Sequence, residues 1–272
     1  MKKYKYSRIN SIKLMLKDIF DTKIIEGNKL LYSIERINYY FCVIAKKEKL
    51  ERKIKKHLKK HLNKKMIIKN KIGIFLGDLF DDSFTKYSYH FEYYIQHWFD
   101  YDKRKDYFLD IGANRGRYSI QAINREKYKK VYAFEPLNYN LKYFQKNIEL
   151  NNLNDKIIVF PYALSDKEKE VKIFFDPIHT GGATIDNPQF KIKEEFVKTK
   201  KLDNFIDKIN PKKVSFIKID VEGHEYKLLK GADEFLNKVK KDTYLMIEIW
   251  KDNKDKEKTI NFLIEKGFNL VE

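Results

Sequence analysis

The sequence predicts an α/β protein with a doubly wound, mostly parallel sheet over residues 101–272, preceded by an α-helical N-terminal extension over residues 1–100. Two observations lead to this prediction. From residue 106 onward, short apolar runs alternate with helical patterns, which is typical of a parallel sheet covered by helices on both faces. Within that part, FLDIGANRGR at residues 108–117 reads as a buried strand that enters a glycine turn and then a helix.

Each element of the parallel part follows from its residue pattern. Short apolar runs bounded by turn residues predict strands, and apolar residues at helical spacing predict helices. Residues 171–206 interrupt the alternation with short strands and loops, which suggests an insertion beside the site. The expected order is strand 106–111, helix 117–127, strand 130–135, helix 138–151 capped by Asn138, strand 157–161, strand 217–219, strand 243–250, helix 255–266 and the start of a sixth strand at 267–272.

The N-terminal extension carries most of the positive charge, because residues 1–70 hold a balance of +15 and residues 71–272 hold +3. Apolar spacing predicts helices over 11–20 and 30–44, then a lysine-rich helix over 46–65 with one narrow apolar seam. Three interpretations of this basic helix stay open: packing on the domain or a second subunit, contact with a membrane surface, and a nucleic-acid arm. Packing is favoured, because the seam has no Trp or Phe to anchor in lipid and lysine far outnumbers arginine.

The composition, 43% hydrophobic and 35% charged, describes a folded globular protein. The single cysteine, Cys42, excludes an intrachain disulfide framework, so we expect a reducing compartment, the cytoplasm, with peripheral membrane contact as the alternative. No apolar run is long enough to span a membrane, and no apolar stretch of a secretory signal follows the basic start.

The glycine turn and the acid after the next strand indicate which cofactor the sheet would hold. Gly112 and Gly116 are four residues apart, so one can take the positive φ of a tight turn while the other lets the helix pack close to the strand. Glu135 lies 19 residues after Gly116, where a carboxylate can accept hydrogen bonds from both hydroxyls of a ribose. The turn also carries Asp110 and Asn114, and a carboxylate there repels phosphate and attracts an ammonium or sulfonium group. The pattern therefore favours S-adenosylmethionine over a dinucleotide.

A second polar group follows the strand that ends at Ile219. Asp220, Glu222, His224 and Glu225 gather at the end of that strand and the start of the next helix. A buried charge cluster is costly unless its members are paired or bind a ligand, so we interpret these residues as a candidate site. Simple solvent exposure is the alternative interpretation.

The combined motifs FLDIGANRG, YAFEP, YALSD, KKLDNF and IKIDVEGHE, over about residues 105–270, resemble the FkbM-like family of S-adenosylmethionine-dependent methyltransferases. The resemblance implies a Rossmann-like class I methyltransferase sheet with strand order 3-2-1-4-5-7-6, although nothing after GFNLVE supplies the antiparallel last strand. The resemblance also implies cofactor contacts from a loop of Asp110, Gly112, Ala113, Asn114 and Gly116, and a ribose-binding acid Glu135 followed by Pro136. It further implies an adenine region of Ala163, Leu164 and Ser165, within YALSD. An ordinary turn is the other interpretation of the YALSD residues.

Many members of that family methylate sugar hydroxyls, so we expect an O-methyltransferase that acts on a nucleotide-linked, lipid-linked or polysaccharide sugar. The catalytic candidates are Asp220 and His224, one as base and the other orienting the acceptor, with Glu222 beside them. A Mg²⁺ ion at Asp220 and Glu248 is a less favoured alternative.

The expected partner is a sugar or sugar-phosphate acceptor whose phosphates would meet the basic N-terminal region, and a homodimer stays an open alternative. Other functions to weigh are methylation of nucleic acid or another small molecule, and a non-catalytic cofactor-binding scaffold. Nucleic acid is disfavoured, because the strand before Asp220 continues as IDVEG instead of the Asn-Pro-Pro-Tyr type of run that holds a flipped base.

Overall fold

The computed structural model describes residues 8–44, 50, 53–55, 57, 65–79, 81–88, 92–185 and 193–271. The chain divides into two compact units, Met1–Gln96 and His97–Glu272, and each is described by itself. Among the described helices, none is both long and apolar enough to cross a membrane.

The first unit combines helices with a small antiparallel sheet of order β1-β2-β3. The predicted α-helical extension therefore also contains a sheet, which the sequence analysis missed. In β2, Met66 and Ile68 are buried while the lysines at its two ends are exposed, which is the period of a half-buried strand. The described elements are α1 (Arg8–Asp21), β1 (Lys23–Glu26), α2 (Lys29–Ile44), β2 (Lys65–Lys69), β3 (Ile74–Asp78) and α4 (Ser83–Tyr87), with a 3₁₀ helix η1 (Tyr93–Asp100) at the boundary between the units.

Charged side chains are buried in pairs within this first unit. Arg36 of α2 lies 2.8 Å from Asp18 of α1, and Lys55 lies 3.4 Å from Glu35. Lys55 belongs to the predicted basic helix over 46–65, so this part of the segment packs inside the unit. Most of the remaining residues of that segment lie outside the described ranges.

The second unit is built on a five-stranded sheet whose strands are all parallel, in the order β12-β11-β4-β5-β6. Read from β6, this is the order 3-2-1-4-5 of the first five expected strands. Every residue of β11 is buried, because the central strands are covered on both faces, and this explains why the strand is apolar apart from Ser215 and Lys218. The strands are β4 (Tyr107–Ile111), β5 (Lys130–Phe134), β6 (Ile157–Phe160), β11 (Val214–Ile219) and β12 (Tyr244–Ile247).

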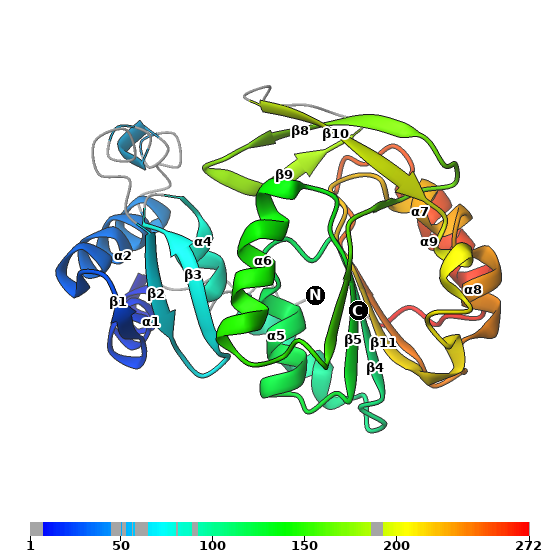
Figure 1. Ribbon diagram of the computed structural model, residues 1–272, viewed down its shortest axis with the longest axis horizontal. Helices are drawn as coiled ribbons and strands as arrows, with labels where there is room; N and C mark the ends of the chain where they lie inside the picture. The colour runs from blue at the N-terminus through cyan, green and yellow to red at the C-terminus, as the bar shows by residue number, and fades with distance from the viewer. Residues whose placement is uncertain are drawn as a thin grey trace. The chain divides into compact units, whose positions relative to one another are not determined.

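Helices cover both faces of the parallel sheet (Figure 1). One face carries α5 (Arg117–Asn124) and α6 (Asn138–Leu150), and the other carries α7 (Glu225–Lys230), α8 (Asp233–Lys238) and α9 (Lys256–Glu265).

Two details of this unit correct the sequence prediction. Leu137 and not Asn138 is the N-cap residue of α6, because Asn138 is already inside the helix, where its backbone N–H and side-chain amide both donate to Glu195. The described residues 267–271 form no strand. Gly267 turns the chain out of α9 with φ +85, and Leu270 is 67% exposed.

A second sheet, of order β7-β10-β8-β9, is formed by the predicted insertion together with β7, which precedes it, and lies at the carboxyl ends of the parallel strands (Figure 1). Thr184 of β9 donates to the carbonyl of Glu222 at 3.1 Å, and Glu195 of β10 accepts from Asn138, so this sheet adjoins the loops that leave β11 and β5. Its elements and the 3₁₀ helices that lead on to β11 are β7 (Ala163–Leu164), β8 (Glu170–Asp176), β9 (His179–Thr184), β10 (Lys193–Lys200), η2 (Leu202–Phe205) and η3 (Pro211–Lys213).

Candidate active site

The turn after β4 brings the carboxyl ends of three parallel strands together. Gly112 has a left-handed φ of +78, and a Cβ added there would lie 1.8 Å from the carbonyl oxygen of Asp220, just after β11. The backbone N–H groups of Gly112 and Ala113 both donate to the carbonyl of Phe134 in β5, each at 3.0 Å. Only glycine fits at position 112, because a side chain would have to occupy the space of another backbone.

Gly116 has the second role that the spacing predicts. It is the N-cap residue of α5 with φ +82, and a Cβ there would lie 2.0 Å from the ring of Phe144 in α6. Asn114, between the two glycines, also has a left-handed φ of +52, which asparagine adopts more readily than most residues. The missing side chain at position 116 therefore lets α5 start directly against α6.

Glu135 is buried at the carboxyl end of β5, with the half-buried Pro136 after it. One carboxylate oxygen accepts from the backbone N–H of Asn114 at 2.8 Å, and the other accepts from the N–H of Leu137 at 3.0 Å and the amide of Asn140 at 3.1 Å. Burial raises the pKa of Glu135 to about 7, and the three hydrogen bonds oppose this rise. A carboxylate offers about four acceptor positions, so Glu135 keeps acceptor capacity for a ligand hydroxyl.

Asp110 is enclosed by protein partners. One oxygen accepts from the hydroxyl of Ser119 in α5 at 2.6 Å, and the other lies 3.9 Å from the ammonium of Lys218. Burial raises the pKa of Asp110, while Lys218 and Ser119 oppose the rise. Lys218 stands opposite Asp110 in the β11–β4 register and also reaches Asp220 at 3.2 Å. The sequence analysis missed Lys218, although a lysine inside the apolar run VSFIKI was the available signal.

The turn offers little to a phosphate group. The N–H groups of Gly112, Ala113, Asn114 and Gly116 all donate to acceptors within the protein. The carboxylate of Asp110 bonds to the first turn of α5, the place where an anion would otherwise bind. A pyrophosphate at this turn would therefore meet a carboxylate and no spare donors from these four residues.

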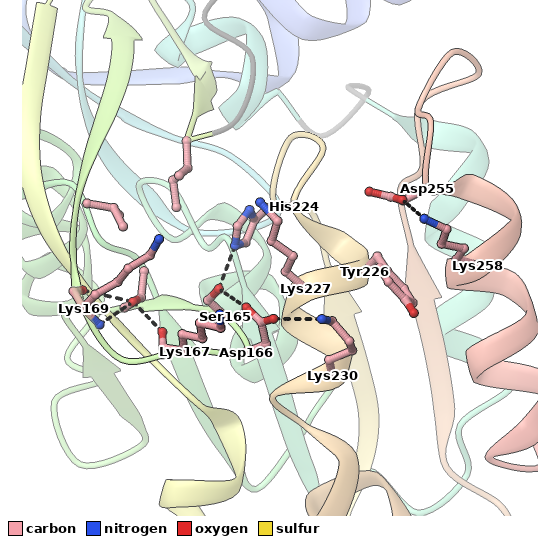
Figure 2. Close-up of a pocket in the computed structure, with 13 residues that line it drawn as sticks. Ser165, Asp166, Lys167, Lys169, His224, Tyr226, Lys227, Lys230, Asp255 and Lys258 are labelled. Carbon is pink, nitrogen blue, oxygen red and sulfur yellow. Dashed lines mark hydrogen bonds and ion pairs between the residues drawn. The ribbon is translucent and has the colours of Figure 1, made fainter.

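The residues predicted to contact an adenine lie on β7 and just after it. Ala163 and Leu164 are buried. The hydroxyl of Ser165 lies 2.9 Å from Nε2 of His224 and 3.2 Å from a carboxylate oxygen of Asp166, as Figure 2 shows. A predicted cofactor residue and a predicted catalytic residue are therefore in direct contact.

The three catalytic candidates lie on the segment between β11 and α7, with different partners. Asp220 is held by Lys218 and keeps 29% of its side chain exposed. Glu222 is half-buried with a left-handed φ of +55, and its carbonyl accepts from Thr184. His224 is buried and directly precedes α7. Of the three, Asp220 has a carboxylate that is both oriented by a cation and open to an acceptor.

Two further acids differ in their surroundings. Glu225 is buried, and burial raises the pKa of its carboxyl group. Its carboxylate accepts from the N–H of Gly223 at 2.8 Å and from the amide of Asn253 at 2.9 Å, so it joins α7 to the loop before α9. Glu248 is exposed just after β12. In the described residues, no three His, Cys, Asp or Glu side chains come together in a way that could hold a metal ion.

These features define an α/β protein with a candidate site at the carboxyl end of its parallel sheet. The family model of the methyltransferase FkbM domain matches residues 110–270, which is more than half of the chain. The chain therefore belongs to the FkbM methyltransferase domain family, and the resemblance read from its motifs is confirmed.

Curated relatives are distant. Methyltransferase 1 of Beauveria bassiana is 26% identical over 147 residues, 47% of this chain and 59% of that protein. Methyltransferase sdnD of Sordaria araneosa is 22% identical over 194 residues, 61% of this chain and 74% of that protein. Hexuronic acid methyltransferase AglP of Haloferax volcanii is 27% identical over 148 residues, 53% of this chain and 56% of that protein. The chain thus spans less than two thirds of the Beauveria and Haloferax relatives.

Among solved structures, methyltransferase FkbM from Methylobacillus flagellatus aligns with a TM-score of 0.42 and 20% identity. The alignment covers 60% of this chain and 37% of that one.

Proposed function

We propose that the chain is an S-adenosylmethionine-dependent O-methyltransferase that transfers a methyl group to a carbohydrate hydroxyl. The observation that carries the proposal is the buried Glu135 carboxylate, which lies against a glycine turn in which four N–H groups already donate within the protein. This combination suits a nucleoside ribose and disfavours a phosphate at the turn. Family membership supports methyl transfer, and the hexuronic acid methyltransferase among the relatives supports a sugar acceptor.

The residues present fit this cofactor by their chemistry. Glu135 would accept from a ribose hydroxyl, and the turn from Gly112 to Gly116 would lie beside the ligand, with Ala163 and Leu164 as apolar contacts for an adenine. When bound, S-adenosylmethionine supplies a methyl group on a positively charged sulfur. Asp110 contributes indirectly in this proposal, since its bonds to Ser119 and Lys218 hold the turn in place.

The chain's part in the reaction is to orient the acceptor and take up its proton. A sugar hydroxyl is a poor nucleophile at neutral pH, so a base near it lowers the barrier. We assign that base to Asp220: the acceptor oxygen would displace the methyl group from the sulfonium sulfur, which would leave as a neutral thioether, while the acceptor's proton would pass to the Asp220 carboxylate. Lys218 at 3.2 Å fixes the direction of this carboxylate. His224 lies at the other end of the segment between β11 and α7, where it can orient the acceptor.

The test follows a labelled methyl group. The full chain is incubated with S-adenosylmethionine carrying a labelled methyl, and separately with a polysaccharide fraction, a nucleotide-sugar fraction and total RNA. We expect label in a carbohydrate fraction and none in RNA. Label in RNA alone would overturn the proposed acceptor class, and no labelled product with any fraction would count against the enzyme activity itself.

A further inference from the structure

A pocket of ≈ 340 Å³ lies between the second sheet and the helices α7 and α9 (Figure 2). It is lined by residues from the loop 165–169, from the segment 224–230, from 255–258, and from Val171, Ile185 and Thr199 of the second sheet and its loop. This volume is within the range of small-molecule sites.

The lining of this pocket is strongly basic, with five lysines against two aspartates. Lys230 is paired with Asp166 at 2.8 Å, and Lys258 is paired with Asp255 at 2.9 Å. In the part of the chain that the structure describes, the ammonium groups of Lys167 and Lys169 form no ion pair. The five lysines are Lys167, Lys169, Lys227, Lys230 and Lys258.

The loop that carries the first two lysines is fixed in place. Thr199 of β10 is 2% exposed, and its hydroxyl accepts from the N–H of Lys169 at 3.0 Å and donates to the carbonyl of Lys167 at 2.7 Å. Glu168, the acid between them, bonds to Lys200 and Asn204, neither of which lines the pocket. The backbone of this loop is therefore held against β10, and Glu168 does not pair with either of the two exposed lysines.

The pocket is joined to the candidate active site through His224, which lines it and contacts Ser165. Asp220 precedes His224 by four residues, a span of at most ~14 Å for an extended chain. A molecule whose sugar reaches Asp220 could therefore place a charged group among these lysines.

We infer that this pocket binds the phosphate or diphosphate of a sugar-phosphate acceptor. The inference rests on the proposed function and specifies its substrate class. Lysine acts as a point charge that suits phosphate, whereas a planar carboxylate is more often bound by arginine, and no arginine lines the pocket. This inference places the phosphate beside β7 and α7, whereas the sequence analysis expected it at the basic N-terminal region. Nucleotide-linked and lipid-linked sugars share this diphosphate chemistry.

The test measures binding of three probes to the full chain by calorimetry: inorganic pyrophosphate, uridine diphosphate and geranyl diphosphate. The variant is the double substitution Lys167→Gln and Lys169→Gln. The matched control is Lys240→Gln and Lys241→Gln, two exposed lysines that precede β12 at the opposite end of the sheet. Both variants lose the same charge, and a thermal melt confirms that each is folded.

We expect pyrophosphate to bind the natural chain, the pocket variant to bind it about tenfold more weakly or worse, and the control to stay within about twofold. Preference for uridine diphosphate over geranyl diphosphate would indicate a nucleotide-linked acceptor, and the reverse preference a lipid-linked one. Equal weakening in both variants, or no binding of any probe, would overturn the inference. S-adenosylmethionine binding is measured in parallel: if it binds while the diphosphates do not, only this inference fails, and if the diphosphates bind while it does not, the proposed function fails.

Discussion

The pKa of Glu135 leads to a prediction about how cofactor affinity depends on pH. Burial raises this pKa to about 7 in the free protein, whereas ribose hydroxyls donate hydrogen bonds to the ionised carboxylate. Binding therefore requires the proton to leave. With a pKa of about 7, roughly a tenth of the Glu135 side chains are ionised at pH 6 and roughly nine tenths at pH 8, so the affinity for S-adenosylmethionine should rise about tenfold over this range.

The same shift predicts the opposite trend for stability. Because the folded pKa lies above the ordinary value of 4.5, the contribution of Glu135 to stability is fully present below pH 4.5 and is lost as pH rises through 7. The shift corresponds to about 3 kcal/mol in the free energy of unfolding. Glu135→Gln keeps an acceptor oxygen in a side chain of similar size but cannot ionise. The free energy of unfolding of this variant should therefore not show the decrease that Glu135 causes as pH rises through 7.

The assay combines calorimetric titration with S-adenosylmethionine and urea unfolding, both at pH 6 and pH 8, on the natural chain and on Glu135→Gln. The reasoning predicts a pH-dependent affinity only in the natural chain, together with release of about half a proton per bound ligand at pH 7. It would be refuted by an affinity that is flat between pH 6 and pH 8, or by the same pH dependence in the variant.

Three further predictions concern the residues around the turn and the base. Gly112→Ala should lower the free energy of unfolding by about 2–4 kcal/mol in urea denaturation, since its Cβ would lie 1.8 Å from the Asp220 carbonyl at a left-handed φ; an unchanged midpoint would contradict this. Lys218→Met should cost about 3–5 kcal/mol by the same assay, because it leaves Asp110 buried without its cation, and a neutral result would show that the pair is dispensable. Asp220→Asn should lower kcat about 100-fold to 10,000-fold while the Kd of S-adenosylmethionine stays unchanged; an unchanged kcat would contradict the role of Asp220 as base. The natural chain should keep full activity in EDTA, and a loss of activity that Mg²⁺ restores would instead favour the metal alternative at Asp220 and Glu248.

Much of the second unit could be predicted because local pattern and packing agree there. β4, β5 and β11 are mostly apolar and almost entirely buried, so the sequence indicates them directly. The left-handed positions 112 and 116 were visible as glycines, and each has a backbone or ring where a side chain would go. The strands of the first unit were missed because they are short: β1 lies between two strong helical patterns, and β2 begins where the predicted basic helix over 46–65 ends.

The parts of the site that depend on contacts between distant residues could not be read in the same way. Lys218 meets Asp110 only because β11 and β4 are neighbours in register, although they are about 100 residues apart in the chain. The basic pocket likewise draws its lysines from three separate segments that the fold brings together. The sequence shows each lysine as an ordinary surface residue, and only the arrangement shows that Lys167 and Lys169 share one pocket.

The most direct measurement for this account is equilibrium binding of S-adenosylmethionine and of NAD to the full chain, each compared with Glu135→Ala. The account predicts that S-adenosylmethionine binds at one site, that NAD binds far more weakly, and that the substitution lowers the S-adenosylmethionine affinity about tenfold to 100-fold, as loss of one hydrogen bond to a charged acceptor requires. Tight binding of NAD, or S-adenosylmethionine affinity that survives the loss of the carboxylate, would contradict it.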